Sequence, residues 1–206
     1  SHDPIVVVDC LRSPIGSFKS SLSSLSATSL ASQVIKALVA RFNSASSIDE
    51  AIFGSVISSN GGQAPTRQAV LKAGLPLSVI TSTINKVCAS GMKAIMFSAQ
   101  SLQLNHQNIM IAGGFESMSN VPYYLKRDSL GYGHVSLIDG ILADGLLDSF
   151  LHIHMGNCGE NTAKKLKISR NDQDEYAIKS YEKATAAAKA GLFNQETTPI
   201  QIKGYW

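Results

Sequence analysis

The sequence predicts an α/β fold with a mainly parallel, mixed sheet and crossover helices. Short apolar runs rich in β-branched residues alternate with longer segments whose apolar residues recur at helical spacing. Glycine, proline and serine residues separate the two kinds of segment. Strands that alternate with helices pair in parallel, because each helix returns the chain to the edge of the sheet where the previous strand began.

Four segments before residue 115 have the character of strands. The run Ile5–Val8 is short, apolar and β-branched, as expected of a strand buried on both faces of a sheet. Further strands are predicted at Ala51–Ile57, Val79–Ile84 and Asn108–Ala112. The pair Gly113–Gly114 ends the last of these strands and predicts a tight turn.

Two helices are predicted between the first three strands. Residues 30–42 are amphipathic, and Ser26 or Thr28 precedes them as a plausible N-cap. Pro65 opens a short second helix in its first turn, where proline is tolerated, and Gly74 closes it.

The regular alternation stops after Met118. Residues 119–156 are rich in Gly, Tyr, Asp and Leu without a clean period, which predicts long loops. Two helices follow, at 160–168 and 171–190, and Ser169 with Asp172 resembles a capping box before the second. Gly191 fits the C′ position after the second helix. We therefore expect two domains, 1–118 and 119–206.

The composition excludes several classes of protein. Of the 206 residues, 44% are hydrophobic and 16% charged, which argues against disorder. No run approaches the roughly 20 apolar residues of a membrane span, and the first residues lack the charged and apolar regions of a signal peptide, so we expect none there. The net charge is +3 without a basic stripe, and Lys164, Lys165 and Lys167 read as a solvated helix face. We therefore expect neither a nucleic-acid partner nor a membrane partner.

The cysteines form no recognisable framework. Cys10, Cys88 and Cys158 are odd in number and widely spaced, which fits neither disulfides nor a zinc site and favours a reducing compartment. The pair His152 and His154 is weak support for a metal, because no third ligand lies near it in sequence. No metal is expected.

Cys88 is the strongest candidate for chemistry. It stands between a predicted strand and a predicted helix that runs to about Leu104, and helix N-termini favour a thiolate. Small residues follow it and would let a substrate carbonyl approach the backbone, where the Cys88 N–H could donate to an oxyanion. From the residues alone, a cysteine in apolar company is more often an inert core residue. The apolar face of this helix comprises Met92, Ile95, Met96, Ala99 and Leu102.

Several strings in the same order resemble the thiolase family. The segment Asn85–Ala94 matches its nucleophile pattern N-x-x-C-A-S-G-x-x-A. Other matching strings are Arg12–Gly16 with Phe18, Gly61–Ala69, Ala112–Ser119, His154–Gly156 and Glu160–Leu166. The resemblance covers essentially the whole chain and is closest to the mitochondrial acetoacetyl-CoA thiolases. It implies a thiolase-like fold, with part of an inserted loop domain after residue 118.

The resemblance implies roles for three residues. Cys88 corresponds to the acyl-accepting nucleophile, and His154 and Met155 correspond to positions that line the coenzyme A pantetheine site. Alone, a histidine there is more often a satisfied or exposed side chain, and a methionine more often fills a core. Glu116 reads as a buried structural carboxylate rather than an acid catalyst. The stretch 61–67 reads as packing and subunit contact rather than a phosphate loop.

The implied activity is that of an acetyl-CoA acetyltransferase, which makes or cleaves acetoacetyl-CoA through an acyl-cysteine. Coenzyme A thioesters would be its substrates, with no tightly bound cofactor, and a homodimer or homotetramer in mitochondria is implied. The family's activating histidine and second cysteine belong to motifs that do not occur here, so we expect an amino-terminal half. The alternative is a short, non-catalytic paralogue that acts as a binding or oligomerisation module. A ketoacyl synthase and a cysteine hydrolase fit these strings less well.

Overall fold

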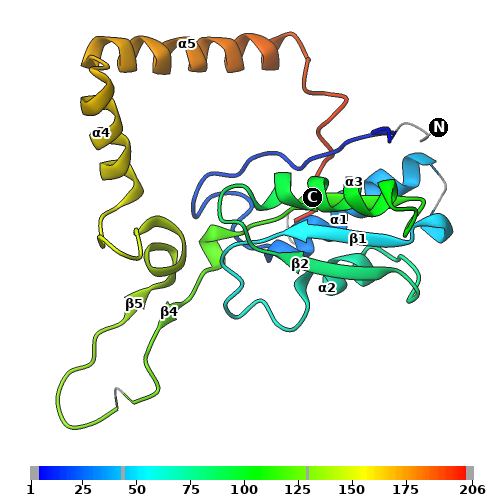
Figure 1. The fold of residues 1–206 in the computed structure, drawn as a ribbon, viewed down its shortest axis with the longest axis horizontal. Helices are drawn as coiled ribbons and strands as arrows, with labels where there is room; N and C mark the ends of the chain where they lie inside the picture. Colours follow the sequence, from blue (N-terminus) through cyan, green and yellow to red (C-terminus); the bar gives the residue numbers. More distant parts are fainter. Residues whose placement is uncertain (1–4, 43–44, 129, 203–206) are drawn as a thin grey trace.

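A three-stranded parallel sheet forms the centre of the protein. The computed structural model describes residues 5–42, 45–128 and 130–202 (Figure 1). The strands are β1 (Glu50–Gly54), β2 (Ile80–Ile84) and β3 (Met110–Gly114), in the order β2-β1-β3. Strands β2 and β3 each pair with β1 in parallel, so Gly54, Ile84 and Gly114 end the strands at one edge. The predicted α/β fold with a parallel sheet is confirmed.

Helices cover both faces of the sheet. Alternate residues of β1 point to opposite sides, and all but its first are buried. Helices α1 (Ala27–Phe42) and α2 (Pro65–Lys72) pack on one face, and α3 (Ser90–Gln103) lies on the other (Figure 1). The core on the first face comprises Ala31, Ile35, Val39, Ile48, Ala51, Phe53, Ala69, Val70, Ala73, Leu75, Val79, Ile111 and Phe115.

The predicted helix boundaries hold for α1 and α2. The Ser26 hydroxyl accepts a hydrogen bond from the Ser29 N–H at 3.2 Å, which makes Ser26 the N-cap of α1. Pro65 occupies the first turn of α2, and Gly74 follows the helix with a φ of 87°. This left-handed conformation is one that glycine adopts without steric cost.

The first predicted strand is wrong. Residues 5–8 are extended but pair with no strand in the described part of the chain, and Val7 is 83% exposed. A β-branched run signals a preference for a pleated, buried surface, but the neighbouring strand that would bury it must come from elsewhere in the fold. The chain instead pairs further on, where Arg12 forms an isolated parallel bridge with Thr197.

The predicted turn at the end of the fourth strand is also wrong. Gly113 and Gly114 are the last residues of β3 and pair with β1 rather than turn. A side chain on Gly114 would lie 3.5 Å from the Gly91 Cα, and one on Gly113 would lie 2.9 Å from the Phe53 ring. The glycines serve close approach between strand, helix and aromatic side chain.

Helix α3 packs on the sheet through its small residues. Ser90, Ala94 and Ser98 are its buried positions, whereas the predicted apolar face includes Met92 and Ile95, which are 64% and 54% exposed. Small side chains allow the helix axis to approach the strands closely, and the large apolar side chains therefore point outward.

Loops and short elements follow the sheet. They are the 3₁₀ turn Met118–Asn120, strands β4 (Tyr123–Tyr124) and β5 (Ile138–Asp139), and the π-helical turn Leu142–Leu146; a further 3₁₀ turn, Ala45–Ser47, precedes β1. The Tyr124 hydroxyl donates to the Asp144 carboxylate at 2.6 Å and lies 2.8 Å from the Ser59 hydroxyl. Burial, followed by the hydrogen bond to Asp144, raises the pKa of Tyr124. These contacts hold the β4–β5 hairpin against the loop that follows β1.

Two helices form an arm that extends from the body (Figure 1). Helix α4 (Met155–Leu166) begins five residues earlier than predicted, and α5 spans Arg170–Lys189. Neither has a buried residue within the described chain. The Ser169–Asp172 capping box is present, with the Ser169 N–H and hydroxyl both bonded to the Asp172 carboxylate, and Gly191 has a φ of 69°. Both predicted end signals are confirmed.

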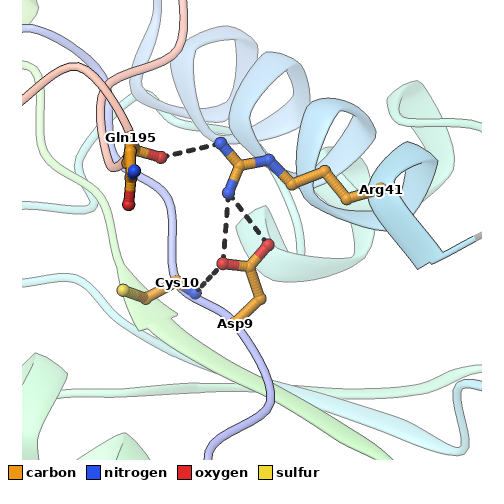
Figure 2. Close-up of polar contacts among 4 residues, drawn as sticks. All are labelled: Asp9, Cys10, Arg41 and Gln195. Atoms are coloured by element: carbon orange, nitrogen blue, oxygen red, sulfur yellow. Dashed lines mark hydrogen bonds and ion pairs between the residues drawn. The ribbon is translucent and has the colours of Figure 1, made fainter.

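The chain returns from the arm to the body through contacts with the amino-terminal segment. Figure 2 shows the Arg41 guanidinium donating to both carboxylate oxygens of Asp9, at 3.1 and 3.0 Å, and to the Gln195 carbonyl at 2.7 Å. The hydrogen bond from Arg41 lowers the pKa of Asp9. Arg12 forms an ion pair with Glu196 at 2.6 Å.

The protein exposes far more surface than a compact chain of its length. Its accessible area is 14819 Å². A folded monomer of this size exposes roughly 9,000–9,500 Å². The arm and the extended amino-terminal segment contribute to the excess. No helix in the described ranges is both long and apolar enough to cross a membrane.

Candidate active site

Cys88 lies on the turn between β2 and α3, as the sequence predicts. Strand β2 ends at Ile84 and α3 begins at Ser90 with Ala89 as its N-cap, so the cysteine lies two residues before the first helical residue. Its side chain is exposed. Unpaired N–H groups at the start of a helix attract negative charge, which suits a thiolate or a developing oxyanion. The position is therefore accessible from solvent.

The turn is held in an uncommon conformation at Val87. This residue has a φ of 49°, in the left-handed region that β-branched residues rarely adopt. Its N–H donates to the Asn85 side-chain oxygen at 2.8 Å, and its carbonyl accepts from the Ser90 hydroxyl at 2.6 Å. The Ser90 hydroxyl in turn accepts from the Lys86 N–H at 2.8 Å. Sequence reasoning missed this network, although an asparagine two residues before a turn is a known signal for it.

Glycine residues seat the start of α3 on the sheet. A side chain on Gly54 would lie 2.4 Å from the Ser90 carbonyl carbon and 2.7 Å from the Gly91 nitrogen. These distances leave no room for a methyl group, so the helix N-terminus rests directly on the end of β1. The close contact fixes the height of the Cys88 turn above the sheet.

Glu116 and Asn85 fix the loop that follows β1. The Glu116 carboxylate accepts hydrogen bonds from the N–H groups of Val56 and Ile57, at 2.8 and 3.2 Å. The Asn85 side-chain amide donates to the Val56 carbonyl at 3.2 Å. These two bonds give the Glu116 carboxylate the structural contacts that the sequence predicts, although the residue is half-buried rather than buried.

His154 caps the helix on which Met155 is the first residue. The His154 Nδ1 atom accepts a hydrogen bond from the Gly156 N–H at 3.0 Å. A neutral ring with this bond carries its hydrogen on Nε2, which can donate to a ligand carbonyl. Met155 is 40% exposed. No hydrogen bond or ion pair joins either residue to Cys88 in the part of the chain that the structure describes.

The other predicted segments have structural contacts. Arg67 donates to the carbonyls of Val79 and Leu77, both at 2.7 Å, which agrees with the packing role expected for 61–67. Within the described ranges, no three His, Cys, Asp or Glu side chains are grouped to hold a metal. A largely apolar cavity of about 530 Å³ lies where the segment 13–18 meets 116–119.

Comparison with known proteins identifies relatives of this sequence. Residues 5–205 match the family model described as thiolase, N-terminal domain. The mitochondrial acetyl-CoA acetyltransferases of Bos taurus and Homo sapiens are each 54% identical over 199 residues, which is 96% of this chain and 47% of each relative. The chain thus spans about half the length of the curated relatives that it matches.

A solved structure has the same fold. The crystal structure of the Acat5 thiolase from Ascaris suum, in complex with coenzyme A, superposes with a TM-score of 0.88 at 43% sequence identity. The superposition covers 92% of this chain and 50% of that one. The sequence match across 5–205 and this structural likeness agree on one assignment: the chain belongs to the thiolase family.

Proposed function

We propose that the protein carrying this chain is an acetyl-CoA acetyltransferase that makes or cleaves acetoacetyl-CoA, with Cys88 as its nucleophile. One observation carries the proposal. An exposed cysteine lies at the N-terminus of a glycine-seated helix, in a sequence 54% identical to acetyl-CoA acetyltransferases. The level of identity supports an active enzyme over a non-catalytic paralogue.

Cys88 would act through an acetyl-cysteine intermediate. Its thiolate attacks the carbonyl carbon of acetyl-CoA, a new carbon–sulfur bond forms, and the bond to coenzyme A breaks. Coenzyme A leaves as a thiolate that takes up a proton. We expect the Cys88 N–H to donate to the intermediate oxyanion. Division of the reaction into two steps replaces one difficult bond exchange with two easier ones.

The second step forms the carbon–carbon bond. A base removes the α-proton of a second acetyl-CoA, and the resulting carbon attacks the acetyl-cysteine carbonyl. The bond between the acetyl group and the Cys88 sulfur breaks, which releases acetoacetyl-CoA and restores the thiolate. The resemblance assigns the base to a second cysteine in a motif that these 206 residues do not contain.

We propose that His154 and Met155 bind the pantetheine arm of coenzyme A. The Nε2–H of His154 would donate to a pantetheine carbonyl, because Nδ1 is engaged by the Gly156 N–H. The exposed Met155 would cover the apolar part of the arm. The Ascaris suum thiolase, which was solved in complex with coenzyme A, supports this proposal through its likeness to the present chain.

The names of the relatives support a mitochondrial location for the protein. We propose in addition a homodimer or homotetramer, a role in lipid and ketone-body metabolism, and a division into an amino-terminal α/β domain (1–118) and part of a loop domain (119–206). Sedimentation of the purified protein tests the assembly.

The test of the proposed activity is an acyl-enzyme trap. The purified protein is incubated with acetyl-CoA, and the acetylated residue is located by peptide mass spectrometry. We expect one acetyl group on Cys88 and none after Cys88→Ser. Cys10, which is also exposed, serves as an internal control. Absence of an adduct on Cys88, or equal labelling of Cys10, would refute the proposed nucleophile.

A further inference from the structure

Val87, the residue before the candidate nucleophile, has a conformation that its own side chain opposes. Seven residues other than glycine have a positive φ within the described ranges, and Val87 is the one β-branched member. A branched Cβ clashes with the backbone in this region, so the conformation persists only where surrounding contacts impose it.

Packing of the Val87 side chain does not impose the conformation. The side chain is 51% exposed, so no tight core holds it. The hydrogen bonds of the turn remain. The Val87 N–H donates to the Asn85 side chain, and the Val87 carbonyl accepts from the Ser90 hydroxyl at 2.6 Å and from the Ser90 N–H at 3.0 Å.

Both holding groups are themselves fixed. Asn85 is anchored by a hydrogen bond from its side-chain amide to the Val56 carbonyl, on the loop after β1. Ser90 is 4% exposed and lies against Gly54, so its hydroxyl cannot rotate towards solvent. The conformation of Val87 is thus transmitted from the sheet through two side chains.

We propose that Asn85 and Ser90 are positioning residues that lock Val87 in the left-handed conformation and thereby aim the Cys88 thiol outward at the start of α3. The inference rests on the proposed role of Cys88 and adds two residues that act through Val87 without touching the substrate. Release of Val87 to an ordinary φ would rotate the following residue, which is Cys88, away from its present direction.

The test is rescue by glycine, which adopts the left-handed conformation without cost. The rate of alkylation by iodoacetamide is measured at Cys88 and at Cys10 in the same sample. We expect Asn85→Ala to slow Cys88 relative to Cys10 by about tenfold, since a left-handed branched residue is costly enough to shift the population by that factor. The double variant Asn85→Ala/Val87→Gly should be alkylated at Cys88 as fast as the single variant Val87→Gly. A purely structural role for Asn85 predicts no such rescue.

A matched control uses the other end of the same helix. Asn105 also has a positive φ, at 56°, so Asn105→Ala strains the end of α3 without contact with the Cys88 turn. It should leave Cys88 alkylation unchanged. If Asn85→Ala does not fold, Ser90→Ala with and without Val87→Gly replaces it in the same comparison.

Acetyl-CoA labelling of the same variants separates this inference from the proposed function. If acetyl-CoA fails to label wild-type Cys88 while alkylation is slowed and rescued as expected, the positioning inference stands and the proposed function fails. Any of three results overturns the positioning inference. Either Cys88 is alkylated at the same rate in Asn85→Ala as in wild type, or Val87→Gly fails to restore the rate, or Asn105→Ala slows alkylation of Cys88 as much as Asn85→Ala does.

Discussion

The close contact at Gly54 gives the most direct test of how the Cys88 turn is supported. We expect Gly54→Ala to destabilise the protein by about 3 kcal/mol, at the upper end of what overpacking costs. The new methyl group would lie 2.4 Å from the Ser90 carbonyl carbon and 2.5 Å from its Cβ, where ordinary contact begins at 3.4 Å. The start of α3 must therefore move by about 1 Å, because no rotamer change can move backbone atoms out of the way.

The measurement is urea unfolding followed by circular dichroism. The matched control is Gly159→Ala on α4, where an added side chain meets nothing within 4 Å. Alanine is the better helix former, so this control should stabilise the protein by about 0.5–1 kcal/mol. A free energy of unfolding for Gly54→Ala within about 0.5 kcal/mol of wild type, the usual range for harmless substitutions, would refute the steric argument.

Three further predictions test the arm and the edges of the body. Ser169→Ala should destabilise α5 by about 1 kcal/mol, seen as faster amide exchange in that helix, while Ser180→Ala on its exposed surface should not. Hydrogen bonds from two backbone amides just before β3 lower the pKa of Asp49. Its contribution to stability is therefore complete above 3.8, its ordinary value, and lost as the pH falls through the lower folded value. Asp49→Asn should weaken the protein at neutral pH, and acid titration should bring its stability and that of wild type together. Arg12→Gln should speed proteolysis within 193–198 by about three- to fivefold, and an unchanged rate would argue against that anchor.

Much of the fold follows from local sequence signals. Pro65 and Gly74 bound α2, and the capping pair Ser169–Asp172 starts α5, because each signal acts through backbone groups within a few residues. The run Ile5–Val8 misled for the opposite reason. Burial of a strand depends on a partner that the run itself does not encode, and residues 5–8 are exposed here.

The site was predictable in position but not in detail. The strand-to-helix setting of Cys88 follows from sequence, since both flanking elements have clear periodicity. The left-handed Val87 does not, because propensity alone argues against a branched residue at a positive φ. The sheet-facing side of α3 was equally hidden. Ser90, Ala94 and Ser98 are small, and hydrophobicity ranks them below the methionines that point outward.

The arm formed by α4 and α5 is a closed loop, and this governs how it unfolds. The chain leaves the body near Leu147, which forms an isolated bridge with His154 at the start of the arm. It returns at Glu196, which is paired with Arg12 of the amino-terminal segment. Helix α5 has no buried residue in the described chain, so it lacks the tertiary packing that stabilises most helices in proteins. Both ends of the arm stay attached to the body when α5 melts. The melted segment therefore gains less conformational entropy than a melted segment with one free end would gain. We therefore expect the arm to unfold and refold locally while the sheet stays folded. Hydrogen exchange should then show weak protection of amides in the arm and strong protection of amides in the sheet.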